Sequence, residues 1–303
     1  MSGLFDILAP ITIILFIGYL IGRSQPNLQT RTVSDLVVYV GTPALIFSTL
    51  VEFEVSAETF WRMALAATSC VLVAGILGLL VLARYRKFWP SFLPSLMFPN
   101  SGNLGIPIVL LAFGQEGLKL AISYFVPIAL AQHSIGLSIS AGSVKIGHLV
   151  RQPILYAIIL SIITLSYDLY IPEILMVTTE ILGGLMIPAM LLLLGISLAN
   201  LSVTDFKPAV LLAFGRLFIG LISAVIVVFL LGLDRIYASV VLVMATMPIA
   251  IVCHVYSERY DRNESQVAGG ILVSTAGAFF VLPVILWISS HIESSGPPSL
   301  GWR

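Results

Sequence analysis

Long stretches without a charged residue decide what this chain can fold into. A helix needs about 20 mostly apolar residues to cross a lipid bilayer, and six uncharged stretches reach that length. Four shorter stretches reach it once their flanking residues are included, which predicts ten transmembrane helices and is compatible with nine to eleven. The long stretches are residues 63–83, 88–115, 120–144, 181–204, 236–257 and 265–292, and the shorter ones are 7–22, 36–51, 152–167 and 217–233.

The overall composition agrees with a protein solvated by lipid. Charged residues make up 10% of the 303 positions, hydrophobic residues make up 58%, and the mean hydropathy is +1.05. So few charges would not cover a water-soluble globule of this size. The connections are too short for a soluble domain, so we expect one all-α membrane domain over residues 1–303. The N-terminal MSGLFDILAP lacks a basic region, which indicates a retained first helix and not a cleaved signal.

Several classes of function are disfavoured by what the chain lacks. Its formal net charge is zero, so no basic surface for nucleic acid is expected. Cys70 and Cys253 fall inside predicted spans and are interpreted as apolar packing residues, not as a disulfide pair. The chain contains no HExxH, GxSxG or GxxxxGK[ST] motif. We therefore expect no enzyme, no bound metal and no cofactor, and leave open a coupling ion, either a proton or sodium.

The distribution of basic residues predicts the orientation in the membrane. The odd-numbered connections between the ten spans hold ten of the fifteen Lys and Arg residues, and the even-numbered side holds four. Basic residues favour the cytoplasmic side of a membrane. Both termini are therefore expected outside the cell.

The two halves of the chain carry matching residues at nearly constant spacing. Five helices in each half is an odd number, so the second copy would enter the membrane from the opposite face. This arrangement is an inverted repeat, with halves 1–147 and 148–303, and such repeats are common in secondary transporters. The matched pairs, 143 to 149 residues apart, are Pro10 with Pro153, Pro43 with Pro188, Phe60 with Phe206, Pro99 with Pro248, and Glu116 with Glu264.

The fourth predicted span is interrupted by the sequence FPNSGNLGIP at residues 98–107. Prolines remove backbone donors and glycines lower helix propensity, so we expect this segment to unwind. An unwound backbone at membrane depth must be buried in protein or line a hydrated cavity. The following half-helix would present free amides that favour an anion, and a proline kink without a ligand is the alternative. The residues concerned are Pro99, Gly102, Gly105 and Pro107 as crossover or hinge positions, and Asn100, Ser101 and Asn103 as substrate ligands.

The ninth predicted span carries a weaker break at Pro248, with Thr246 two residues before it. As the repeat partner of Pro99, Pro248 predicts two broken helices that cross near the membrane midplane. Thr246 would then be a minor substrate ligand.

Four other polar residues lie inside predicted spans, where polar groups are costly and often functional. Gln132 would contact the substrate, and His133 would carry a coupling proton or bond to a neighbouring carbonyl. Arg216 would line the pathway or extend to the cytoplasmic interface. Glu180 would line the pathway or serve a structural, interfacial role.

The segment FPNSGNLGIP resembles the broken fourth helix of the auxin efflux carrier family, whose bacterial members include malonate and malate permeases. YVGTPALIFSTL, IPAMLLLLGISLA and SERYDRNESQVAGGILVSTAGAFFVLP resemble the same family in matching order. The resemblance implies ten helices in two inverted repeats, with crossing broken helices 4 and 9, as in bile-acid and sodium–proton carriers. It further implies an elevator mechanism, with helices 3–5 and 8–10 moving against a scaffold of helices 1, 2, 6 and 7 that could form a homodimer contact.

In plant-type members of that family, the asparagine after the crossover proline helps hold the substrate carboxylate, and Asn100 matches it. Gln132 matches a glutamine near that site. This chain lacks the long central loop of the plant carriers, which favours a bacterial organic-acid permease of the inner membrane over an auxin carrier.

The resulting hypothesis is a secondary transporter of small organic anions that works by alternating access. A sodium–proton antiporter on the same fold is the nearest alternative, although neither break contains a carboxylate. A ligand sensor that does not transport is a third reading.

Overall fold

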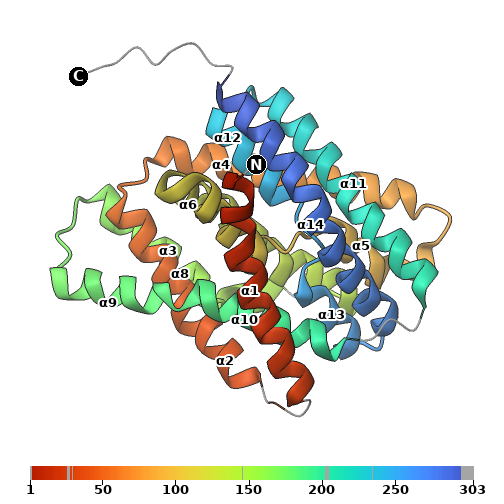
Figure 1. The fold of residues 1–303 in the computed structure, drawn as a ribbon. Helices are drawn as coiled ribbons and strands as arrows, with labels where there is room; N and C mark the ends of the chain where they lie inside the picture. The colour runs from red at the N-terminus through yellow and green to blue at the C-terminus, as the bar shows by residue number, and fades with distance from the viewer. Residues whose placement is uncertain are drawn as a thin grey trace.

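The computed structural model describes residues 2–25, 28, 30–144, 146–201, 205–233 and 235–294. Within these ranges the protein is built from helices, and the one strand-like feature is an antiparallel bridge between Pro99 and Ile249 (Figure 1). The helices are α1 Ser2–Ser24, α2 Arg31–Leu36, α3 Thr42–Glu52, α4 Ala57–Val81, α5 Trp89–Met97, α6 Ile106–Ala131, α7 Leu137–Ala141, α8 Pro153–Ser166, α9 Glu173–Gly184, α10 Met186–Asn200, α11 Phe206–Leu230, α12 Arg235–Ala245, α13 Ile251–Arg259 and α14 Glu264–Ser294. Short π-helical turns at η1 Val37–Gly41, η3 Ser101–Gly105 and η4 Gln132–Gly136, and 3-10 turns at η2 Arg86–Phe88 and η5 Ile146–Arg151, join them.

Within the described ranges, seven helical segments are long and apolar enough to cross a membrane. This result confirms an all-helical membrane protein, while the arrangement of ten spans stays a prediction. Two expected spans, at α8 and α12, are shorter helices of 14 and 11 residues. The segment Ser101–Ala141 contains two helices joined at Gly114, whose φ of 63° and ψ of −154° are open to glycine but costly for other residues.

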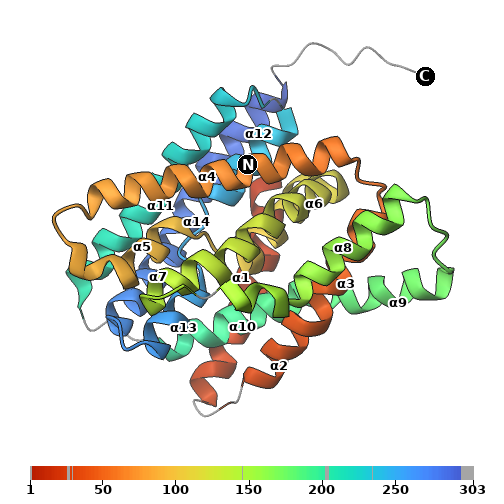
Figure 2. The same cartoon turned by 180° about the vertical axis from the view of Figure 1, so that it is seen from behind.

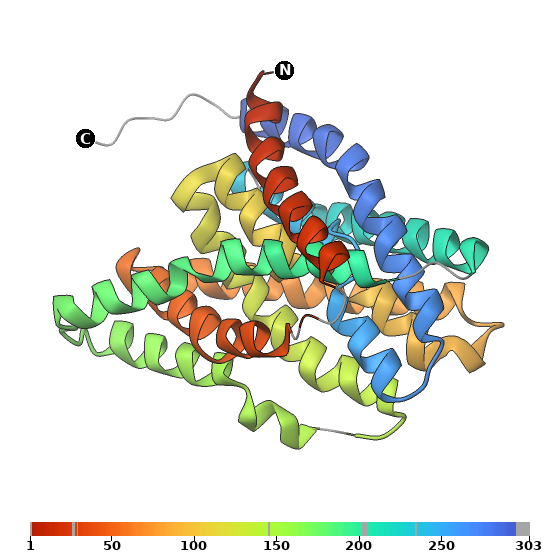
Figure 3. The same cartoon turned by 60° about the horizontal axis from the view of Figure 1, so that its bottom comes forward.

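The helices form two groups that pack mainly within themselves. In the first group, α1 lies across α10, and α3 packs between α8 and α9 (Figure 1). In the second group, α11 packs along α14, and α4 and α12 both contact α6 (Figure 2). Figure 3 shows α3, α8 and α9 together on the left and α11 and α14 on the right. The broken segment after α5 lies between the groups, because η3 contacts both α10 and α12.

The first group is held together where glycines let α1 and α10 approach each other closely. Gly18 and Gly22 are spaced four residues apart on α1 and face Gly195 and Ala199 on α10. A Cβ added at Gly22 would lie 2.8 Å from the Cβ of Ala199, and one added at Gly195 would overlap the carbonyl oxygen of Leu15. Small residues at this spacing are how membrane helices bring their backbones into contact.

We expect Gly195→Ala to destabilise the protein, because the new methyl group forces two backbones apart. The cost of such overpacking is about 1–3 kcal/mol, and it would lower the melting temperature of the purified protein in detergent. The matched control is Gly184→Ala, where no neighbouring heavy atom of the described residues lies within 4 Å of the added Cβ. Equal melting temperatures for the two variants would contradict the close α1–α10 contact.

Candidate functional site

Two interrupted helices cross at one point and pair through their backbones. The chain leaves α5 at Met97 and is extended at Phe98, and a second extended segment follows α12 around Pro248. The amide of Asn100 donates to the carbonyl of Pro248 at 2.8 Å, and the amide of Ala250 donates to the carbonyl of Phe98 at 3.2 Å. Each break thus supplies hydrogen-bond partners to the other, as buried backbone requires. The predicted breaks at both prolines are present and in contact.

The first break is shorter than expected, because only Phe98, Pro99 and Asn100 leave the helical conformation. Ser101–Gly105 form a π-helical turn that contains Gly102, and the helix continues directly into α6. Pro107 is the second residue of α6 and follows the π-helical turn without a break, so it is accommodated within a continuous helical segment. The expectation that residues 98–107 unwind as a whole is therefore wrong, and Gly105 and Pro107 are helical in this conformation.

Two side chains from other helices bind backbone groups of the crossing. The amide nitrogen Nε2 of Gln132 donates to the carbonyl of Pro99 at 3.2 Å. The hydroxyl of Ser274, on α14, accepts a hydrogen bond of 3.2 Å from the amide of Ile249. The sequence analysis missed Ser274, because a single serine in an apolar span gives no signal until its neighbour is known.

Arg216 is buried behind the crossing, with 1% of its surface exposed. Its Nη1 donates to the carbonyls of Leu96 at 2.7 Å and Met97 at 3.3 Å, at the end of α5. Its Nε donates to Met247 at 3.2 Å, and its Nη2 donates to Ala245 at the end of α12. The guanidinium therefore binds the ends of both broken helices. It does not extend to the membrane interface, and it is not among the residues that line the cavity described next.

A cavity of about 430 Å³ lies beside the crossing. Its walls come from both helix groups. One wall is formed by α2, η1, α8 and α10, and the other is formed by the crossing, α6, η4 and α13. Six of the residues selected from the sequence line this cavity: Pro99, Asn100, Gly102, Asn103, Gln132 and His133.

The remaining selected residues are elsewhere. Ser101, Gly105, Pro107 and Pro248 do not line the cavity. The hydroxyl of Thr246 donates back to the carbonyl of Leu242 at 2.5 Å, and the residue is 2% exposed, so it is not presented to a ligand. Glu180 lies exposed on α9, away from the cavity.

The cavity is rich in hydrogen-bond donors. Nδ2 of Asn100 is buried and has no hydrogen-bond partner among the described residues. His133 faces the cavity, and its Nδ1 is 2.8 Å from the hydroxyl of Tyr256 on α13. Arg31, the first residue of α2, lies on the wall, and its Nε is 3.9 Å from a carboxylate oxygen of Asp35. Among the described lining residues there is no Asp or Glu. The buried, unpartnered donor of Asn100 suits an anionic ligand, whereas the charge of Arg31 is already paired with Asp35.

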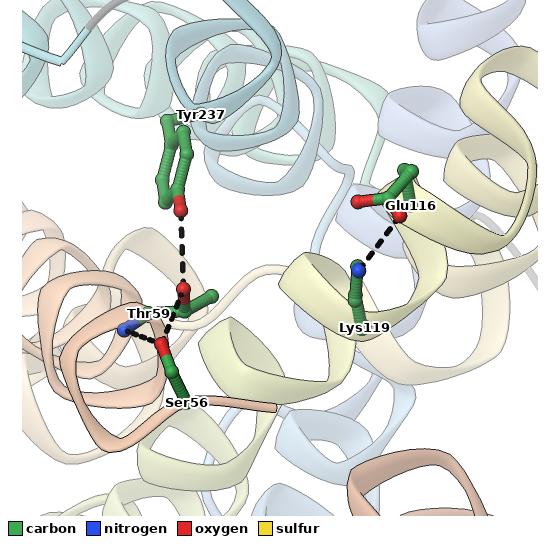
Figure 4. Close-up of polar contacts among 5 residues, drawn as sticks. All are labelled: Ser56, Thr59, Glu116, Lys119 and Tyr237. Carbon is green, nitrogen blue, oxygen red and sulfur yellow. Dashed lines mark hydrogen bonds and ion pairs between the residues drawn. The ribbon is translucent and has the colours of Figure 1, made fainter. Parts of the chain in front are cut away.

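A second polar pocket, of about 240 Å³, lies near the N-terminal end of α12, far along that helix from the crossing. Thr59 on α4 is 3.2 Å from the hydroxyl of Tyr237 on α12 and 3.0 Å from the hydroxyl of Ser56 (Figure 4). Lys119 and Glu116 form an ion pair of 2.7 Å on the pocket wall. The contact between Thr59 and Tyr237 joins α4 to α12.

We expect Ser274→Ala to destabilise the crossing, because it leaves the buried amide of Ile249 without an acceptor. Loss of one partner from a buried donor costs about 1–3 kcal/mol, which a lower melting temperature of the purified protein would report. Ser289→Ala is the matched control: Ser289 is on the same helix, is equally buried at 0% exposure, and its hydroxyl has no partner among the described residues. The prediction fails if Ser274→Ala is as stable as Ser289→Ala.

Comparison with known proteins identifies the family of this chain. The model of a family described as "Membrane transport protein" matches residues 4–143 and 140–286. An uncharacterized transporter of Methanocaldococcus jannaschii is 24% identical in an alignment of length 303 that covers 93% of this chain and 98% of the relative. An uncharacterized transporter of Methanothermobacter thermautotrophicus is 29% identical over 278 residues, which cover 86% of this chain and 88% of the relative. The chain therefore belongs to the membrane transport protein family, the family of the auxin efflux carriers.

Proposed function

We propose that this protein is a secondary transporter of small organic anions, and that the crossing binds the substrate carboxylate. The observation that carries the proposal is the cavity of about 430 Å³, whose floor presents Asn100 and Asn103 and whose described wall contains no acidic side chain. The buried, unpartnered Nδ2 of Asn100 is a donor that a carboxylate oxygen would satisfy.

The electrostatics of the cavity support an anion over a cation. The helical segment that begins at η3 and continues into α6 starts at the cavity, and the start of a helix carries partial positive charge and free amides. Arg31 also brings a guanidinium to the wall, where it is solvent-exposed and 3.9 Å from Asp35, so its contribution is small. A molecule with one carboxylate at Asn100 and a second anionic group near Arg31 or His133 would use both regions, which makes short dicarboxylates the first candidates.

The division into two helix groups supports an elevator-like alternating-access mechanism. The substrate would bind to the moving group, which comprises α4–α7 and α11–α14, and slide with it against the scaffold of α1–α3 and α8–α10. Both groups line the cavity, and the polar pocket at Thr59 and Tyr237 lies near the end of α12 that is remote from the crossing. In this proposal the ten spans form two inverted repeats, 1–147 and 148–303, whose broken members are the segments paired at Pro99 and Pro248.

The proposed carrier works in the plasma membrane, specifically a bacterial inner membrane, with both termini outside. Met1 and residues 295–303 lie outside the described residues. The apolar outer faces of α1 and α9, which expose Phe16, Ile174 and Ile181 among others, would contact lipid or a second copy through the scaffold.

The two alternative functions make different demands on the site. A sodium–proton antiporter would use a buried carboxylate to bind its ion, and the described cavity wall offers Asn, Gln and His instead. A sensor that does not transport would bind the same anion without moving it. Flux of labelled anion into proteoliposomes separates a carrier from a sensor.

We expect Asn100→Ala and Asn103→Ala to weaken uptake of labelled malonate or malate into proteoliposomes. A hydrogen bond to a charged group is worth about 1.5–3 kcal/mol, so the apparent affinity should fall about tenfold to a hundredfold. Asn200→Ala is the control, because Asn200 is exposed at the end of α10 and does not line the cavity. Unchanged uptake kinetics in both cavity variants would exclude this site.

His133 is the proposed carrier of a coupling proton, because imidazole titrates between about pH 5 and 8 and its ring faces the cavity. If uptake is driven by protons, an inward proton gradient should stimulate the parent protein, and His133→Gln should abolish that stimulation while anion binding remains. Tyr256→Phe removes the hydroxyl bonded to Nδ1 and should weaken the stimulation without abolishing it. Full stimulation of His133→Gln would assign the proton to another group.

A further inference from the structure

The crossing leaves several backbone carbonyls of the broken helices without their usual partners. In an unbroken helix the carbonyl of Leu96 would accept from the amide of Asn100, but that amide donates to Pro248. The carbonyl of Ala245 would likewise accept from the amide of Ile249, which donates to Ser274. Both carbonyls, with those of Met97 and Met247, point instead at the guanidinium of Arg216.

Four carbonyl oxygens converge at the ends of two helices, and such a group of oxygen atoms has the chemistry of a cation-binding site. Oxygen ligands suit hard cations, and the carbonyl ends of half-helices are where secondary transporters bind sodium. Each helix end also carries partial negative charge, which favours a cation. In this protein the cation that the carbonyl oxygens contact is the guanidinium of Arg216, which belongs to α11.

Little space remains beside the guanidinium for a second cation. The void that borders Arg216 is lined by Cys70, Tyr124 and Gly220 among others and has a volume of about 10 Å³, which is at the lower limit of the about 10–15 Å³ that a single water molecule needs. The helix that carries Arg216 is packed tightly against α12, because a Cβ added at Gly220 would overlap the carbonyl oxygen of Ala245. Among the described residues Arg216 forms no ion pair within 4 Å, so its charge is balanced by carbonyl dipoles.

We propose that Arg216 is a positioning residue that acts as a tethered cation: it holds the two broken helices together and occupies the place that a coupling metal ion would otherwise fill. Sodium then has no role at the crossing of the intact protein. Removal of the guanidinium exposes the four carbonyls and converts the crossing into a site for a small monovalent cation.

The test is the melting temperature of the purified full-length protein in sodium chloride and in N-methyl-D-glucamine chloride at equal ionic strength. The parent protein should melt at the same temperature in both. Arg216→Ala should melt at a lower temperature in N-methyl-D-glucamine and gain about 5 °C in a saturable manner as sodium is added, as mass action requires of an ion that binds the folded state. Millimolar methylguanidinium should raise it similarly.

Lys207→Ala is the matched control, because it removes one positive charge from an exposed position on the same helix; it should behave as the parent. A melting temperature of Arg216→Ala that responds to neither sodium nor methylguanidinium overturns the proposal, since a purely structural loss would not depend on cations. Sodium dependence of the parent protein also overturns it.

Arg216→Lys decides the question if Arg216→Ala does not fold. Lysine keeps the charge but has three donors in place of five, so this variant should melt below the parent and remain indifferent to sodium. A sodium-dependent melting temperature in Arg216→Lys would contradict the proposal.

Discussion

The structure depends on hydrogen bonds that satisfy unwound backbone inside a protein solvated by lipid. An unpaired amide or carbonyl in hydrocarbon costs several kcal/mol, so neither broken helix could be stable alone. The breaks at Pro99 and Pro248 supply each other with amides and carbonyls. Gln132, Ser274 and Arg216 satisfy further groups around them. The crossing thus supplies each broken helix with hydrogen-bond partners that it lacks within its own backbone.

The same crossing separates two chemical environments. On one side the carbonyl ends of α5 and α12 surround a buried guanidinium in nearly complete packing. On the other side Asn100 and Asn103 face a cavity between the two helix groups. Carbonyl ends attract cations and helix starts attract anions. The carbonyl ends here hold the guanidinium of Arg216, and in the proposed function the helix start at the cavity binds the anion.

Much of the candidate site was predictable because its signal is local. Proline and glycine within an apolar span indicate a break, and polar residues next to the break, such as Asn100 and Asn103, necessarily lie beside it. Gln132 and His133 were selected as polar residues inside a span, and both reach the cavity. Thr246 was selected on the same grounds, but its hydroxyl is bound within its own helix. A polar residue inside a span indicates that its side chain has a hydrogen-bond partner, but it does not indicate whether that partner is a ligand or a group of the protein.

The sequence by itself determined that the chain is helical, lies in a membrane and breaks at Pro99 and Pro248, because these follow from hydropathy and from the missing amide of proline. Only the tertiary structure decided what the breaks face. The partners of Arg216 lie 29 to 120 residues away in the chain, and Ser274 lies 25 residues from Ile249. Such pairs are set by how helices pack, and packing geometry is not encoded in any local pattern of residues.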